Sequence, residues 1–139
     1  MKVVLDWMKS LCPLSDETIR ELEACVTPCH FPKKHLLVRE GIFCKYAYFI
    51  EKGMTRSYWL VDGEEFTTSF AYDGCIVFSM DELYYNQVSQ EFVETLEEVQ
   101  AYRILITDLR RLWETNLELS NWGRIIHQNE YRRLHQSHK

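Results

Sequence analysis

The stretch "YFIEKGMTRSYWLVDGEEFTTSF", Tyr48 to Phe70, contains two alternating apolar runs joined at Asp62-Gly63. Asp-Gly between β-rich runs predicts a hairpin, because a type I′ turn needs positive φ at both central residues. Short β-rich runs continue on both sides of this stretch, and this rhythm predicts an all-β sandwich or jelly roll. The predicted runs are 35–40, 46–52, 55–61, 65–72, 75–79, 91–97 and 100–106.

Helices are predicted on both sides of the roll. Val3–Leu11 has an amphipathic pattern, and Ser15 can cap a second helix that runs through about Val26. After Thr107 the chain is predicted to be helical to its end. We therefore expect N-terminal helices and a β-roll over residues 1–107, and a C-terminal helix over residues 108–139.

Composition limits the classes of protein to consider. A chain of 139 residues with 46% apolar content can bury one core, and no apolar run approaches the ~20 residues of a membrane span. The apolar part of the N-terminus is too short for a signal peptide, so we expect a cytoplasmic protein with no membrane partner. From Ser57 to Tyr102 there are ten acidic residues and no Lys or Arg, which argues against nucleic-acid binding by this segment.

The last predicted helix carries a regular pattern with steps of three and four residues. This spacing is typical of a coiled-coil seam, in which a single Asn helps to fix the register. We predict that the seam joins two copies of the chain into a homodimer. In the alternative interpretation, the same face packs on the chain's own β-roll. The predicted seam consists of Leu119, Trp122, Ile126, Asn129 and Arg133.

The roll contains "REG", "YFIEKG", "DGEE" and "DG", and "ITDLRRL" enters the long helix. With this order of elements, the chain from Leu14 to about Leu134 resembles the effector domain of the Crp/Fnr family of bacterial transcription regulators. The resemblance implies a double-stranded β-helix, the cyclic-nucleotide-binding-domain fold, with a long C-terminal dimerisation helix. Family members continue into a winged helix-turn-helix, which this chain lacks. We therefore expect DNA contact only through such a domain.

Cyclic-nucleotide binders of this family cradle the phosphate with a Phe-Gly-Glu run, a short helix and an Arg followed by small residues. The corresponding segment here is "IVFSMDELYYNQVSQEFVE", in which Phe78 fits, Ser79 replaces the Gly and Met80 replaces the Glu. The Arg position falls near Ser89 or Gln90. A phosphate without a cationic partner forfeits charge-assisted hydrogen bonds of about 1.5–3 kcal/mol each. We therefore do not expect cyclic AMP or cyclic GMP as the ligand.

A cassette without its anion chemistry could still hold a neutral or cationic small molecule, or it could simply close the roll. The polar candidates for ligand contact are Ser79, Asp81, Glu82, Ser89 and Gln90, and the candidates for the wall are Thr68, Phe78 and Met80.

Metal-binding and catalytic alternatives have weaker support. Cys25, Cys29 and His30 lack the tight spacing of cluster and zinc sites, and no H-x-H pair indicates a cupin metal site. No G-x-S-x-G elbow is present. We therefore predict a non-enzymatic sensor domain without cofactor or metal, in a Crp/Fnr-like regulator with an unknown small-molecule effector. The alternatives are a stand-alone small-molecule-binding β-roll and, less favoured, a cupin-like metalloprotein.

Overall fold

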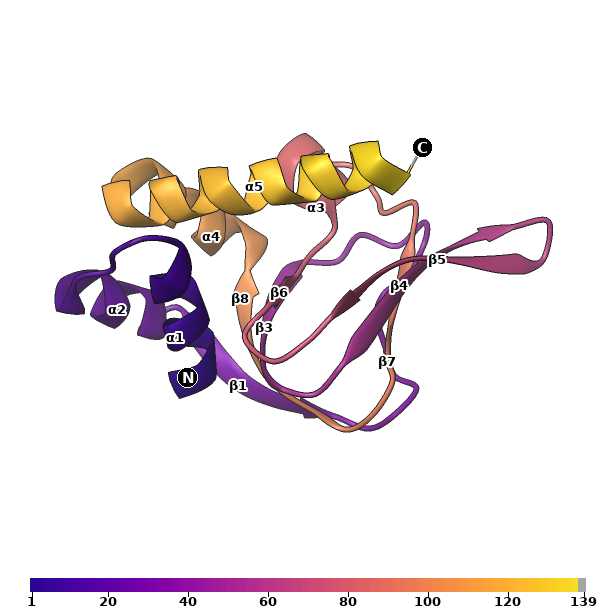
Figure 1. The fold of residues 1–139 in the computed structure, drawn as a ribbon, viewed down its shortest axis with the longest axis horizontal. Helices are drawn as coiled ribbons and strands as arrows, with labels where there is room; N and C mark the ends of the chain where they lie inside the picture. The colour runs from indigo at the N-terminus through magenta and orange to yellow at the C-terminus, as the bar shows by residue number, and fades with distance from the viewer. Residues whose placement is uncertain (138–139) are drawn as a thin grey trace.

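The computed structural model describes residues 1–137, without the side chains of Met80 and of residues 133–137. Within this part of the chain, two antiparallel four-stranded sheets form a roll that helices flank (Figure 1). The strands are β1 (Val26–Phe31), β2 (Leu36–Val38), β3 (Tyr46–Lys52), β4 (Thr55–Val61), β5 (Glu64–Ala71), β6 (Ile76–Val77), β7 (Phe92–Thr95) and β8 (Val99–Leu105). The helices are α1 (Lys2–Leu11), α2 (Asp16–Glu23), α3 (Met80–Tyr85), α4 (Ile106–Thr115) and α5 (Leu117–Ser137).

The predicted fold class is confirmed. One sheet has the strand order β1-β8-β3-β6 and the other β2-β7-β4-β5. The predicted hairpin is the β4–β5 pair, whose turn residues Asp62 and Gly63 have φ of 52° and 82°. Both values lie in the left-handed region that a type I′ turn requires.

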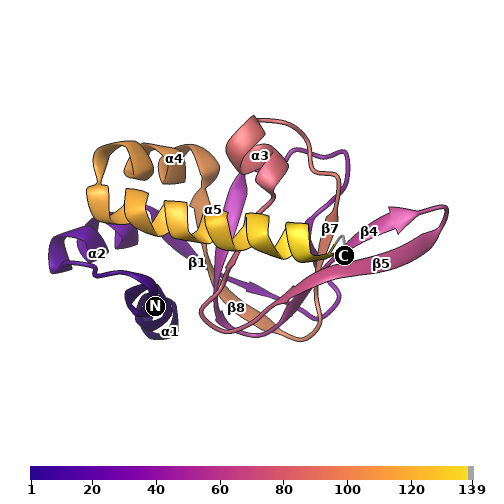
Figure 2. The same ribbon diagram turned by 45° about the horizontal axis from the view of Figure 1, so that its top comes forward.

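Strand β3 separates two hydrophobic cores because successive side chains of a strand point to opposite faces. Tyr48 and Ile50 point into the roll, where they pack with Val93 and Val99. Ala47 and Phe49 point to the other side, where α1, α4 and α5 cover the sheet (Figure 2). The helices on this side bury Val4, Met8, Leu109, Leu112, Leu119 and Trp122.

The structure corrects the predicted dimer seam. Leu119 and Trp122 are 0% exposed and Ile126 is 4% exposed, and Trp122 stacks on Phe49 with ring centroids 5.8 Å apart. These three side chains belong to the chain's own core, as in the alternative interpretation. The spacing did not distinguish the two interpretations, because the apolar face of a helix repeats every three or four residues whether it packs within a chain or between chains. Asn129 is exposed on the same helix, and the side chain of Arg133 lies outside the described residues.

Two element boundaries also differ from the sequence-based expectation. The predicted single C-terminal helix is divided at Asn116, whose backbone is extended and whose Oδ1 accepts a hydrogen bond from the N–H of Leu119 at 3.0 Å. Strand β1 was not predicted because it contains Pro28. It lies at the edge of its sheet, where a residue without an N–H is tolerated.

No helix within residues 1–137 combines the length and the apolar content that crossing a membrane requires.

Candidate functional site

A hollow of about 220 Å³ lies between the roll and helix α5. Strands β4 and β5 contribute Ser57 and Ser69 to it, and α5 contributes Ile126, Asn129 and Glu130. The remaining lining residues come from α1, β5, the segment around β6, and the start of β7. They are Trp7, Phe70, Ala71, Cys75, Ile76, Val77, Phe78 and Glu91.

The lining combines aromatic walls with hydroxyl, amide and carboxylate groups. Glu91 and Glu130 are its charged members, and the described lining contains no Lys or Arg. Such a set can accept hydrogen bonds from a polar ligand, while the carboxylates disfavour a second anion nearby. The described lining of the hollow is therefore both aromatic and acidic.

The cassette segment forms a closed structure beside this hollow. Helix α3 begins after Ser79, which is 2% exposed and whose hydroxyl has no partner among the described groups. The carboxylate of Asp81 accepts a hydrogen bond from the N–H of Gln90 at 3.2 Å. The hydroxyl of Ser89 donates a hydrogen bond to the carbonyl of Glu91 at 3.0 Å and accepts one from the N–H of Glu91 at 3.1 Å. Ser89 and Gln90 thus help to close a turn.

Glu82 points inward from α3 and is 0% exposed. Its Oε2 accepts a hydrogen bond from the N–H of Cys44 at 2.7 Å, but its Oε1 has no partner among the described groups. Burial raises the pKa of this carboxyl to about 7, against the opposing effect of backbone hydrogen bonds from Cys44 and Ser89. Neighbouring Asp81 raises the pKa further. Glu82 is therefore a buried acid with one unsatisfied oxygen, a combination that makes its ionised form costly.

Helix α3 is attached to the C-terminal helices by a cation and by aromatic rings. Arg110 of α4 donates its Nε–H to the carbonyl of Leu83 at 2.8 Å and also donates to the carbonyl of Glu82. The ring of Tyr84 stacks on Trp113 of α4 at 5.9 Å and lies 4.5 Å from His127 of α5. Burial raises the pKa of the Tyr84 phenol. A displacement of α3 would consequently change the packing of α4 and α5.

The predicted ligand contacts are only partly brought together. Phe78 lines the hollow, and Thr68 lies next to it, with its hydroxyl 3.2 Å from the carbonyl of Ser57. The side chain of Met80 lies outside the described residues. The other predicted residues form the closed α3 segment and do not belong to the described lining; they are Ser79, Asp81, Glu82, Ser89 and Gln90.

Sequence reasoning missed the lining residues that are distant along the chain. Trp7 arrives from α1, and Asn129 and Glu130 arrive from α5. No local pattern identifies them, because their approach depends on how the helices dock on the sheet. The spacing that singled out Asn129 was the only signal, and it was read as a dimer contact.

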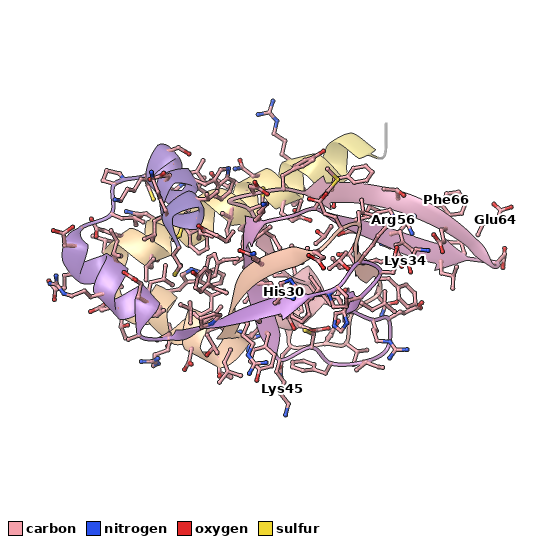
Figure 3. All side chains as sticks on the ribbon, turned by 90° about the horizontal axis from the view of Figure 1, so that it is seen from below. His30, Lys34, Lys45, Arg56, Glu64 and Phe66 are labelled. Atoms are coloured by element: carbon pink, nitrogen blue, oxygen red, sulfur yellow. The ribbon has the colours of Figure 1, made fainter. Side chains whose placement is uncertain are left out.

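Arg56 directly precedes the acidic middle of the chain, Ser57–Tyr102, and it does not line the hollow. It lies on the face of β4 opposite to Ser57, because neighbouring side chains of a strand alternate. Arg56 is labelled in Figure 3. Its guanidinium is 2.6 Å from Glu65 and 3.4 Å from Glu94, and it lies 4.3 Å over the ring of Tyr58. Its charge is thus already paired.

The cysteine and histidine candidates for a metal site lie apart. Cys25 is 3.5 Å from the guanidinium of Arg111, whereas Cys29 and His30 line a second hollow of about 470 Å³ on the outer face of the first sheet. His30 is 4.0 Å from the carboxylate of Glu98, and both are largely exposed. Among the described residues, no three His, Cys, Asp or Glu side chains are grouped to hold a metal.

A sequence model of one protein family matches residues 28–116, more than half of the chain, and describes a cyclic nucleotide-binding domain. No curated protein sequence matches the chain.

Solved structures similar to the chain include regulators and a kinase subunit. The catabolite activator protein of Thermus thermophilus is 14% identical over 89% of the chain, with a TM-score of 0.77. A regulatory subunit of a cAMP-independent protein kinase A from Trypanosoma brucei, as a mutant bound to cAMP, is 16% identical over 98%, also with a TM-score of 0.77. A putative Crp/Fnr regulator from Eubacterium rectale is 14% identical over 88%, with a TM-score of 0.75. The chain spans 58%, 49% and 58% of these proteins, and the likeness concerns the fold.

Proposed function

The chain belongs to the cyclic nucleotide-binding domain family, and from that premise we propose that it is the effector domain of a Crp/Fnr-like transcriptional regulator that does not respond to cAMP or cGMP. It acts by binding a small molecule and not by catalysis. We infer that contact with DNA is made through a helix-turn-helix domain.

The observation that carries this proposal is the absence of Lys and Arg from the described lining of the hollow. We align Ser89 and Gln90 with the family's arginine position. The guanidinium of Arg110 binds the carbonyls of Glu82 and Leu83 in α3, and that of Arg56 is paired with Glu65. A phosphate in the hollow would lie near Glu91 and Glu130 without the cation that family binders use. Losing even two charge-assisted hydrogen bonds, at about 1.5–3 kcal/mol each, reduces affinity by two to four powers of ten.

A structural neighbour gives this interpretation a parallel. The Trypanosoma brucei regulatory subunit is described as cAMP-independent, and the form bound to cAMP is a mutant in which, among three changes, a threonine is replaced by arginine. This is consistent with the argument that the fold alone does not secure a cyclic nucleotide and that an added cation helps to do so.

The response to a ligand runs through α3. A ligand in the hollow contacts Phe78, which packs edge-to-face on Tyr84 with ring centroids 5.9 Å apart. Tyr84 in turn stacks on Trp113, and Arg110 fixes the carbonyls of α3 to α4. Movement of the segment Ser79–Gln90 would therefore reposition α4 and α5, which lead toward the position of a DNA-binding domain.

A thermal-shift panel of metabolites, with cyclic nucleotides included, tests the proposal. A genuine effector raises the melting temperature of the chain, and Ser69→Trp abolishes the shift by filling the hollow. Thr67→Trp is the matched control, because Thr67 is exposed on the opposite face of the same strand. A shift by cAMP, or a ligand shift that survives Ser69→Trp, contradicts the proposed site.

A further inference from the structure

The hollow between the roll and α5 has a size that limits what it can hold. Its volume is about 220 Å³. For comparison, an apolar protein cavity of about 150 Å³ accepts a single benzene ring. The hollow therefore has room for about two fused rings. A ligand that adds a ribose and a phosphate to such rings is larger than the hollow.

Aromatic side chains supply part of the lining and are held in place by their neighbours. Trp7 and Phe78 both line the hollow, together with Phe70. Trp7 packs directly on Gly74, where an added Cβ would lie 2.8 Å from the Cβ of Trp7. Phe78 packs edge-to-face on Tyr84, with ring centroids 5.9 Å apart. Aromatic rings favour stacked or edge-to-face contact with a further ring. The lining therefore favours a planar aromatic ligand.

The described lining also offers neutral hydrogen-bonding groups. Ser57 of β4 and Ser69 of β5 are directly opposite each other in the antiparallel register, and both line the hollow. The Cβ atoms of such a pair lie about 5 Å apart on one face of the sheet. Helix α5 adds the amide of Asn129. Hydroxyl and amide groups both donate and accept hydrogen bonds. Together they fit a ligand edge on which a donor lies next to an acceptor, as in a carboxamide.

The charges at the hollow argue against a charged ligand. Glu91 and Glu130 are the charged residues of the described lining, and both already have interaction partners in the chain. One of these contacts is a hydrogen bond from the hydroxyl of Thr68 to Oε2 of Glu91, at 3.4 Å. An anion would be repelled by both carboxylates, whereas a cation would have to replace the partners that they already have. A neutral ligand avoids both costs.

We propose that the hollow selects an uncharged, planar ligand of about two fused rings that carries an amide, or a similar donor–acceptor pair, at its edge. This inference rests on the proposed function, because it names the chemical class of the small molecule that the effector domain binds. The rings contact the aromatic side chains, and the amide reaches Ser57, Ser69 and Asn129. Phe78 belongs to the same lining, so this ligand also contacts the residue that leads to α3.

Three probes with the same fused rings and different charges test the proposal. They are indole-3-carboxamide, which is neutral, indole-3-carboxylate, which is an anion, and 3-aminomethylindole, which is a cation. The carboxamide and the carboxylate have nearly the same shape and both hydrogen-bond to hydroxyls, so their comparison isolates the effect of charge. Titration of the chain, followed by the NMR resonances of its backbone amides, measures each Kd and locates each site. We expect the carboxamide to bind at the hollow with a Kd of about 1 mM or lower, at least about tenfold more tightly than either charged probe.

Two alanine variants test which residues bind the amide. Ser69→Ala removes one hydroxyl from the hollow and should weaken binding of the carboxamide by about two- to tenfold, because one hydrogen bond is lost. Thr67→Ala is the matched control, because Thr67 is exposed on the opposite face of the same strand, and its Kd should equal that of the wild type. Both substitutions shorten a side chain on a strand, and circular dichroism checks that both variants are folded.

Several results would overturn this inference. They are a carboxamide that does not bind in the millimolar range, a charged probe that binds as tightly, resonance changes located away from the hollow, or an unchanged Kd in Ser69→Ala. These results would leave the proposed function standing, because they concern the class of the effector and not its existence. Binding of cAMP by the wild-type chain is the separate result that contradicts the proposed function.

Discussion

The buried carboxyl of Glu82 makes the stability of the chain depend on pH within a defined window. Burial raises its pKa from 4.5 to about 7, so the folded chain holds a proton that the unfolded chain releases. The contribution of this group is complete below pH 4.5 and is lost as the pH rises to 7. Above pH 7 both states are ionised, and no further loss occurs.

The size of the effect follows from linkage. The folded state loses about 1.4 kcal/mol of stability for each pH unit in this window, which gives about 2 kcal/mol between pH 5.5 and pH 8. Glu82→Gln removes this dependence because the amide does not ionise. With a urea m-value of about 2 kcal/mol per molar, the midpoint difference between variant and wild type should change by about 1 M between the two pH values.

Urea unfolding of both proteins at pH 5.5 and pH 8 measures this change. The difference in stability between variant and wild type is compared at the two pH values. In this comparison the titration of all other carboxyls cancels, and so does the pH-independent cost of packing an amide. Ser79→Ala is the control, because it deletes a neighbouring buried hydroxyl that does not titrate, and its offset should be equal at both pH values. If Glu82→Gln and wild type lose stability in parallel from pH 5.5 to pH 8, the desolvation of Glu82 is refuted.

Three further substitutions test the packing of the helices. Trp122→Glu places a charge at a site with 0% exposure and should lower the free energy of unfolding by more than about 4 kcal/mol. Circular dichroism should then show no cooperative thermal unfolding. The control Arg124→Glu, on the exposed face, should keep the cooperative transition. If Trp122→Glu were instead folded and monomeric, the result would support the prediction that Trp122 lies in a contact between two copies of the chain. Gly123→Ala adds a Cβ 2.5 Å from Nε1 of Trp113 and should destabilise the chain by about 1–3 kcal/mol in urea, although alanine favours helices; a stabilised variant would disprove that close approach. Arg110→Ala should speed hydrogen exchange in residues 80–90 relative to Arg110→Lys, and equal protection in both would show that Arg110 does not hold α3.

Local signals predicted the parts of the fold that local chemistry determines. Asp62-Gly63 specifies its turn through backbone conformation alone, and the alternating strands around it could be read directly. Ser15 was predicted to cap α2, and its hydroxyl accepts a hydrogen bond from the N–H of Thr18 at 3.2 Å. Strand β1 was not predicted because it contains Pro28, and proline is tolerated in a strand only at the edge of a sheet. Whether a strand lies at an edge depends on the arrangement of the whole sheet.

The candidate site was less predictable because distant segments build it. The sequence has no Lys or Arg from Ser57 to Tyr102, but it does not show that Glu82 turns inward to Cys44 while Ser89 and Gln90 close a turn. The prediction of a seam on α5 was wrong for a related reason. An apolar face on a helix indicates that the face is buried, but only the tertiary arrangement shows that Phe49 of the same chain covers it.

Calorimetric titration of the purified chain with cAMP, up to about 1 mM, tests the central claim most directly. At this concentration even weak binding is detected, because a Kd of 1 mM corresponds to only about 4 kcal/mol of binding free energy. We predict no saturable heat for the wild type, and measurable binding when Gln90→Arg supplies the missing cation. Saturable binding of cAMP by the wild-type chain with a Kd in the micromolar range would contradict the account.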